Sequence, residues 1–209
     1  MEAVNKVAKP RLRFFWAAVE EILDYARESL HKLSEEEVEA FVERLLNARD
    51  SKKILIAGAG RTGLMGKAFA MRLMHLGFNS YVVGETITPA LTSRDILIAL
   101  SGSGSTTIVV EAAKAAKKVG AYVIGITSYR DSPLAETSDL VVRIPGRTKI
   151  SEKTDYFSRQ ILGLHEPLLP LGTQFETNCM VFLDAVIVEL MKRLGVSEEE
   201  LLSRHANIE

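Results

Sequence analysis

Two short stretches rich in glycine and hydroxyl side chains could bind an anionic group. The first, GAGRTG at 58–63, contains Arg61 and Thr62, and the second, SGSGST at 101–106, alternates serine with glycine. Glycines let several backbone N–H groups turn toward one acceptor, and the N-terminus of a following helix adds partial positive charge. The second stretch therefore predicts a nest for a single phosphate ester. The predicted substrate-binding residues are Gly60, Arg61, Thr62, Ser101, Gly102, Ser103, Gly104, Ser105 and Thr106.

Other interpretations of these stretches remain open. The glycines at 58–63 match the G-x-G-x-x-G dinucleotide fingerprint, with Glu85 near the position of the ribose-binding acid. Arg61, however, stands where a pyrophosphate would pass close to the backbone, so we expect no NAD or FAD. A Walker loop is excluded because Gly66 and Lys67 lack the earlier glycine and the following Ser or Thr. The serine stretch could also be an ordinary turn with Thr106 as a helix cap.

The two glycine-rich stretches are positioned by the strands and helices around them, which the sequence shows as short apolar runs and helical patterns in turn. The strand-like runs are continuous rather than alternating, which is typical of parallel strands buried on both faces. They occupy 53–60, 80–85, 95–103, 121–128 and 140–145, and helical patterns occupy 62–76 and 106–119. The sequence predicts an α/β fold with a doubly wound, mostly parallel five-stranded sheet and helices on both faces.

Helices are also expected at both ends of a single domain spanning 1–209. The pattern from Phe14 to about Asn47 predicts two helices, the second beginning in a capping box of Ser34 and Glu37. Residues 146–172 are expected to form a long excursion. A long helix at about 174–194 and a short helix capped by Ser197 follow it.

Composition narrows the function classes. With 26 basic and 27 acidic residues the net charge is −1, so no overall field attracts nucleic acid or a membrane surface. The N-terminal apolar patch is interrupted by acidic residues, which predicts an amphipathic helix rather than a secretory signal. Cys179 is the single cysteine, which suits a reducing compartment, and we expect a cytoplasmic protein. The four histidines, at 31, 75, 165 and 205, are scattered, so no metal is expected.

The motifs resemble those of the sugar isomerase (SIS) family. SGSGST is similar to that family's S-x-S-G-x-T phosphate loop, and further likeness lies in GAGRTG, AFAMRLMHLGF, VGETITP, PLGTQFE and RHANIE, from about residue 50 onward. The resemblance implies a flavodoxin-like sheet and interconversion of a 3-keto hexulose 6-phosphate with fructose 6-phosphate, as in the ribulose monophosphate pathway of formaldehyde assimilation. It implies no cofactor and a homo-oligomer, a tetramer or dimer. Thr62 replaces an expected serine, and the excursion is longer than in compact members.

The same resemblance implies two catalytic residues. Glu176 stands where the family places a catalytic glutamate, although Thr173 and Glu176 also form a T-x-x-E pattern that a capping box alone would explain. His205 would handle protons on the substrate oxygens, supplied to a neighbouring subunit, or it could merely cap the last helix. His75 is expected to be a core or helix C-terminal residue.

Arg61 and Glu85 complete the expected site. Arg61 could bind phosphate or a sugar hydroxyl, or pair with Glu85 across the mouth of the site, and Glu85 is the reserve base. Two rival functions remain: a non-catalytic sugar-phosphate-binding regulator and an aldose–ketose isomerase. Residues 1–49 are acidic and amphipathic and lack a basic recognition helix, which disfavours a DNA-binding regulator.

Overall fold

The computed structural model describes residues 11–146, 169, 170 and 172–205. Two helices, α1 (Arg13–Leu30) and α2 (Glu35–Leu46), precede the first strand, as the sequence predicts. Strands and helices then alternate as far as β5, except that β3 follows β2 with no helix between them, and α7 (Thr173–Leu194) and α8 (Glu198–Ser203) follow. Most of the predicted excursion at 146–172 lies outside the described residues.

Five parallel strands form one sheet in the order β2-β1-β3-β4-β5, which confirms the predicted fold class. They are β1 (Lys53–Gly58), β2 (Asn79–Val82), β3 (Ile96–Leu100), β4 (Tyr122–Thr127) and β5 (Leu140–Arg143). The central strand β3 is buried at every position because helices cover both faces. The chain reverses its direction of winding between β1 and β3, and ligands bind beyond the carboxyl ends of strands at such a point.

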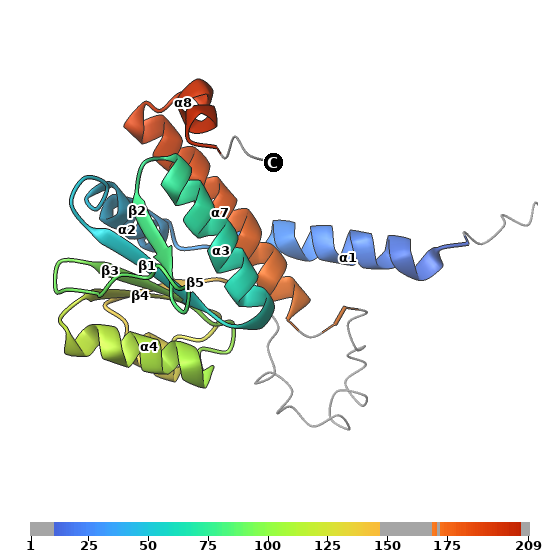
Figure 1. Ribbon diagram of the computed structural model, residues 1–209. Helices are drawn as coiled ribbons and strands as arrows, with labels where there is room; N and C mark the ends of the chain where they lie inside the picture. Colours follow the sequence, from blue (N-terminus) through green and yellow to red (C-terminus); the bar gives the residue numbers. More distant parts are fainter. Residues whose placement is uncertain (1–10, 147–168, 171, 206–209) are drawn as a thin grey trace, which may run out of the picture.

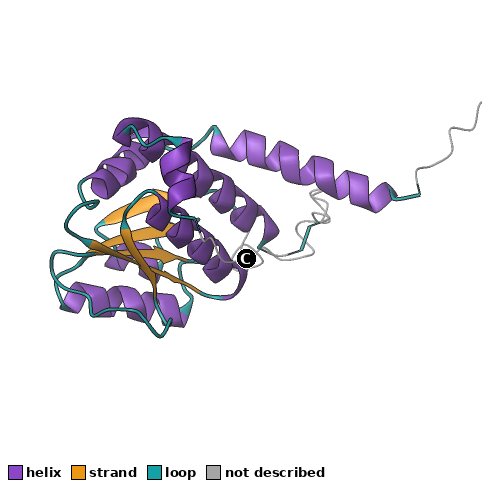
Figure 2. Ribbon diagram, turned by 45° about the horizontal axis from the view of Figure 1, so that its top comes forward, coloured by secondary structure: helices purple, strands orange, loops and turns teal. Residues whose placement is uncertain are grey.

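Helices cover the two faces of the sheet as separate layers (Figures 1 and 2). On one face lie α2, α3 (Gly60–His75) and α7, where Phe41 stacks on Phe69 and Phe182 with ring centroids 6.3 and 5.7 Å apart. On the other face lie α4 (Thr107–Lys118) and α5 (Pro133–Thr137). Both layers bury apolar area against the strands, the dominant favourable contribution to folding.

Helix α2 begins as predicted at Ser34, whose hydroxyl accepts the Glu37 backbone N–H at 3.2 Å. The reciprocal half of the expected capping box is absent. The Glu37 carboxylate instead accepts the backbone N–H of Arg143 at 2.9 Å and pairs with Arg130. Glu37 therefore ties α2 to the carboxyl end of β5 instead of closing its own helix turn. At α8 the capping box is complete between Ser197 and Glu200.

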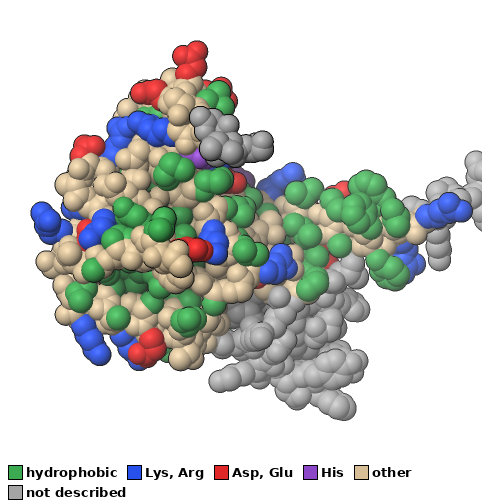
Figure 3. All heavy atoms as spheres, viewed as in Figure 1, with side chains coloured by type: hydrophobic (Ala, Val, Ile, Leu, Met, Phe, Trp, Pro, Cys, Tyr) green, Lys and Arg blue, Asp and Glu red, His purple; other side chains and the backbone are tan. Residues whose placement is uncertain are grey.

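Helix α1 projects away from the sheet, and its C-terminal part packs on α7 (Figures 1 and 2). Large apolar side chains along it are exposed, and Figure 3 shows hydrophobic side chains gathered on this arm. They are Leu12, Phe14, Phe15, Trp16 and Leu23. An apolar groove of about 410 Å³ lies near the base of α1, between α2 and α7. None of the described helices combines the length and apolar character needed to cross a membrane.

Candidate active site

The GAGRTG turn connects β1 to α3 and brings the backbone at Gly58 unusually close to the backbone at Gly63. A Cβ atom at Gly58 would lie 2.9 Å from the Gly63 Cα, and one at Gly63 would lie 2.9 Å from the Gly58 carbonyl oxygen. Gly60, the first residue of α3, has φ +56°. These glycines therefore serve a tight strand-to-helix connection, which places Arg61 and Thr62 in the first turn of α3 at the carboxyl edge of the sheet.

The serine loop connects β3 to α4, as predicted. The Ser101 and Thr106 hydroxyls are hydrogen-bonded at 2.8 Å, and Ser103 Oγ accepts the Ser105 hydroxyl at 3.0 Å. At Gly104, φ is +63°, and a Cβ atom would lie 2.0 Å from Ser132 Oγ. Thr106 is the N-cap of α4, but its side chain makes no capping hydrogen bond. Its hydroxyl closes the loop onto Ser101, so helix capping alone does not explain this threonine.

The start of α7 forms the third wall of the site. Its N-cap is Gly172, with φ +93° and no side-chain cap, and Thr173 is already inside the helix. The alternative that Glu176 belongs to a Thr173 capping box is therefore wrong. The Glu176 side chain is 14% exposed, and its Oε2 lies 3.1 Å from Arg61 Nε. That oxygen is buried and accepts no well-aligned hydrogen bond from the described residues.

Beside the site, Phe175 packs between the serine loop and the segment that follows β5. A Cβ atom at Gly102 would lie 2.8 Å from the Phe175 ring, and one at Gly146 would lie 2.5 Å from the Phe175 Cα. The side chain is buried, and it precedes Glu176 directly. Phe175 therefore fixes the start of α7 against the serine loop. Sequence reasoning missed this role, although an aromatic residue beside the candidate base was the signal available.

A pocket of about 320 Å³ opens between these three segments. It is lined by Ala59, Gly60, Arg61, Thr62, Gly102, Ser103, Thr106, Gly172, Phe175 and Glu176. The structure thus brings together seven of the predicted site residues, while Ser101, Gly104 and Ser105 complete the loop without lining the pocket. The N-terminal ends of α3, α4 and α7 all border it, so three helix dipoles favour an anion there.

Glu85 does not join this pocket. A pair with Glu85 was one alternative for Arg61, but its carboxylate partner is Glu176. Glu85 pairs with Lys67 and borders a different pocket, between α3 and β2. The Arg61–Glu85 alternative is wrong because the return of the chain at 172–176 places the Glu176 carboxylate beside Arg61.

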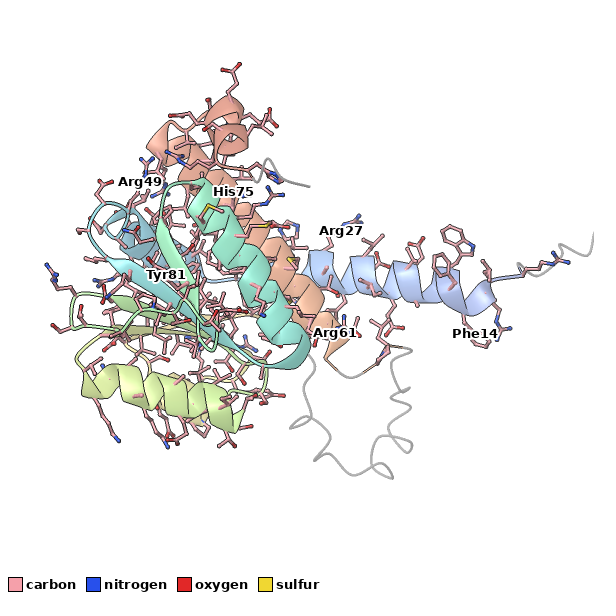
Figure 4. The ribbon with its side chains drawn as sticks, in the orientation of Figure 1. Phe14, Arg27, Arg49, Arg61, His75 and Tyr81 are labelled. Carbon is pink, nitrogen blue, oxygen red and sulfur yellow. The ribbon has the colours of Figure 1, made fainter. Side chains whose placement is uncertain are left out.

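His205 lies at the opposite end of α3 from Arg61. Its ring is 5.1 Å from the ring of His75, the last residue of α3, and Figure 4 shows Arg61 and His75 at the two ends of that helix. A helix of 16 residues spans about 24 Å, so within one chain His205 is remote from Glu176. His75 is 3% exposed, as the sequence predicts for a core histidine. Burial, followed by the nearby charges of His205 and Arg72, lowers the His75 pKa.

The arrangement suits acid–base chemistry on a phosphorylated compound. Backbone N–H groups and hydroxyls face the pocket from one side, and a half-buried carboxylate with a guanidinium faces it from the other. Among the described residues, no group of three or more His, Cys, Asp or Glu side chains could hold a metal ion. Cys179 is buried in the core, and burial raises its thiol pKa to about 12, so the thiol stays protonated.

The fold and this site define a class of protein. The family model of the SIS domain matches residues 48–161, and the chain belongs to the SIS domain family.

Proteins of similar sequence and structure narrow the comparison within this family. A Bacillus subtilis protein named 3-hexulose-6-phosphate isomerase is 39% identical, with 91% of this chain and 95% of the relative covered. A Methanocaldococcus jannaschii protein of the same name is 43% identical, with 82% and 83% covered. A crystal structure of a hypothetical protein from Methanococcus jannaschii, described as inferring that molecular function, has a TM-score of 0.73 and 35% identity, covering 93% of this chain and 99% of that chain.

Proposed function

We propose that the chain is a 6-phospho-3-hexuloisomerase, which interconverts 3-hexulose 6-phosphate and fructose 6-phosphate. The observation that carries the proposal is the meeting of the serine loop and Glu176 in one pocket. The relatives named 3-hexulose-6-phosphate isomerase support this choice of substrate. The ribulose monophosphate pathway of formaldehyde assimilation is the metabolic setting that we infer for this reaction.

The serine loop binds the phosphate group in this proposal. Ser103 and Thr106 border the pocket at the N-terminus of α4, and Gly102 exposes backbone there. A phosphate oxygen accepts hydrogen bonds from such groups and gains from the helix dipole. Arg61, whose side chain is 64% exposed, can turn toward the sugar or the phosphate.

Glu176 is the proposed base. It removes the proton from carbon 2 of the 3-keto sugar, the carbon next to the carbonyl, to form an enediolate spanning carbons 2 and 3. It then returns a proton to carbon 3, while the hydroxyl proton on carbon 2 passes to the oxygen on carbon 3. Its Oε2 atom is paired with Arg61 at 3.1 Å, so the exposed guanidinium turns toward the substrate before this oxygen takes the proton.

His205 is the proposed carrier of the oxygen protons and acts in the site of a second copy. Its distance from Glu176 along α3 excludes that role within one chain in the described arrangement. A Glu176→Gln chain and a His205→Ala chain, each inactive alone, should regain activity when refolded together. A mixed oligomer then contains one site with both wild-type groups. Failure of mixing to restore activity would assign His205 a structural role.

The exposed arm of α1 provides the proposed contact between copies. Four large apolar side chains at its N-terminal end, and Leu23 further along, face solvent in one chain, an arrangement that marks interaction surfaces. A second copy offers the apolar groove between α2 and α7. We infer a homo-oligomer, a dimer or tetramer. Phe15→Glu with Leu23→Glu should shift the mass measured by analytical ultracentrifugation toward that of the monomer, and an unchanged mass would contradict this contact.

Proton NMR of fructose 6-phosphate in heavy water tests the reaction. Deuterium at carbon 3, or a new 3-keto ester, is the expected result. Deuterium at carbon 1 would instead identify an aldose–ketose isomerase. A sugar phosphate that binds without exchange or conversion would favour a regulatory module.

A further inference from the structure

A second polar pocket lies at the amino ends of the strands, on the edge of the sheet opposite the serine loop. Its volume is about 360 Å³. It is lined by Arg44, Ser51, Lys52, Ser93, Arg94, Asp95, Ile96, Lys117, Gly120, Ala121, Tyr122 and Asp139. Four of these side chains are basic and two are acidic, and these six come from α2, α4 and the segments just before β1, β3 and β5. The pocket therefore collects positive charge from segments that are distant in sequence.

Both carboxylates in this pocket are already engaged. Asp95 accepts the backbone N–H groups of Lys53 and Thr92 at 2.9 and 2.8 Å and the Thr92 hydroxyl at 2.6 Å, and the Lys53 ammonium lies 3.3 Å away. Burial opposes ionisation, but these hydrogen bonds hold the Asp95 pKa below its usual range. Asp139 accepts the backbone N–H of Val123 at 2.8 Å and pairs with Lys117. Neither carboxylate is free to neutralise the remaining cations.

The other three cations of the pocket, Arg44, Lys52 and Arg94, form no ion pair with a carboxylate of the described residues. Lys52 directly precedes β1 and Arg94 lies in the turn before the neighbouring strand β3, so both basic side chains border the pocket from the amino ends of adjacent strands. The Arg44 guanidinium lies over the Tyr122 ring, 3.7 Å from its centroid, which holds a third cation against the same edge.

Helix termini explain only part of this charge. Arg44 lies in the last turn of α2 and Lys117 in the last turn of α4, where cations favourably meet the helix dipole. Lys52 and Arg94 lie outside any helix, so that effect does not account for them. Like charges that border one pocket repel each other, and an anion bound between them removes this repulsion. The hydroxyls of Ser51 and Ser93 add donors at the same edge.

We propose that this pocket binds a small phosphate-bearing polyanion, of the diphosphate or bisphosphate class, at a site separate from the catalytic pocket. Lys52 and Arg94 bind its charged oxygens with the help of the two serine hydroxyls, and the Arg44–Tyr122 pair forms one wall. The inference does not depend on the proposed isomerase activity, because the two pockets share no residue.

Isothermal titration of the full chain with inorganic pyrophosphate, in the presence of saturating fructose 6-phosphate, tests the site. The wild type should bind pyrophosphate, and Lys52→Gln with Arg94→Gln should weaken binding about a hundredfold, because each lost charge-assisted hydrogen bond costs about tenfold in affinity. The matched control is Lys32→Gln with Lys118→Gln, which removes two exposed lysines outside the pocket and should change affinity less than about twofold.

Two results would overturn the proposal. One is no heat of binding at millimolar pyrophosphate for a wild-type chain that circular dichroism shows to be folded. The other is an equal loss of pyrophosphate affinity in the pocket variant and the control variant, which would mean that the affinity depends only on net charge. A pocket variant that has lost its native circular dichroism is replaced by Arg94→Gln alone, for which about tenfold weaker binding is expected and wild-type affinity contradicts the proposal.

Discussion

Arg61 Nε and Glu176 Oε2 lie 3.1 Å apart and join the first turns of α3 and α7 across the pocket. The two partners differ in burial, since the arginine side chain is 64% exposed and the glutamate side chain 14%. The guanidinium can therefore move into solvent or toward a ligand while the carboxylate stays in place. This asymmetry suits a fixed base next to a mobile binding group.

Replacing Glu176 with glutamine should separate catalysis from binding. We expect turnover to fall by roughly two to four orders of magnitude, the usual contribution of general acid–base catalysis, while sugar phosphate binding is largely retained. Steady-state kinetics and calorimetry measure the two quantities. Glu189→Gln, on the exposed surface of the same helix, is the control and should keep wild-type turnover. A Glu176→Gln chain that works normally but melts earlier would show a structural glutamate.

Ser103→Ala should weaken ground-state binding. The hydroxyl borders the pocket, and loss of one hydrogen bond to a charged phosphate costs about tenfold in affinity. Titration should show this loss for both fructose 6-phosphate and inorganic phosphate. Ser203→Ala, which removes an exposed hydroxyl of α8, is the matched control. Unchanged affinity in Ser103→Ala would remove the serine loop from the phosphate site.

Gly102→Ala should disturb the proposed base, Glu176, through Phe175. The new methyl group would lie 2.8 Å from the aromatic ring, and overpacking of this kind costs about 1–3 kcal/mol of stability. Turnover should fall as Glu176 shifts with its neighbour. Combining Gly102→Ala with Phe175→Leu makes room for the methyl group, so the two effects should be non-additive in chemical denaturation. Strict additivity would mean that the two residues do not act on one another.

Stability should depend on the protonation of His75. Its pKa in the folded protein is below the ordinary value of 6.5, so the unfolded chain binds more protons as the pH falls through that value. The free energy of unfolding is then highest above that pH and decreases on acidification. His75→Gln should show a smaller decrease than the wild type in urea titrations, whereas the exposed His31→Gln should match the wild type. Equal slopes in all three proteins would contradict this source of pH dependence.

The sheet and the two loops were predictable because their signals are local. Buried parallel strands read as continuous apolar runs, and the serine–glycine spacing of 101–106 marks a strand-to-helix nest. The partner of Arg61 was not predictable, since it depends on where the chain returns at 172–176. The capping-box alternative for Glu176 could not be decided from the sequence either. A T-x-x-E pattern is present, but Gly172, with φ +93°, takes the N-cap position.

The contact between Phe175 and Gly102 was also beyond local reasoning. The two residues are far apart in sequence, and they meet only when α7 packs beside the carboxyl edge of β3. The distance between His205 and Glu176 has the same origin, because the chain must run the length of α7 before it reaches α8. Functional roles that depend on such packing can be assigned only when the tertiary arrangement is known.

The projecting helix α1 also contains the chain's single tryptophan, Trp16, whose side chain is 55% exposed and meets the Phe15 ring edge-on. Indole emission moves to shorter wavelength when the ring leaves water. The intrinsic fluorescence of the whole protein therefore reports on this one arm, while the sheet and its helix layers contribute no tryptophan signal. A dilution series followed by emission wavelength can thus detect the release of α1 from a partner, while circular dichroism reports separately on the folded sheet and helices.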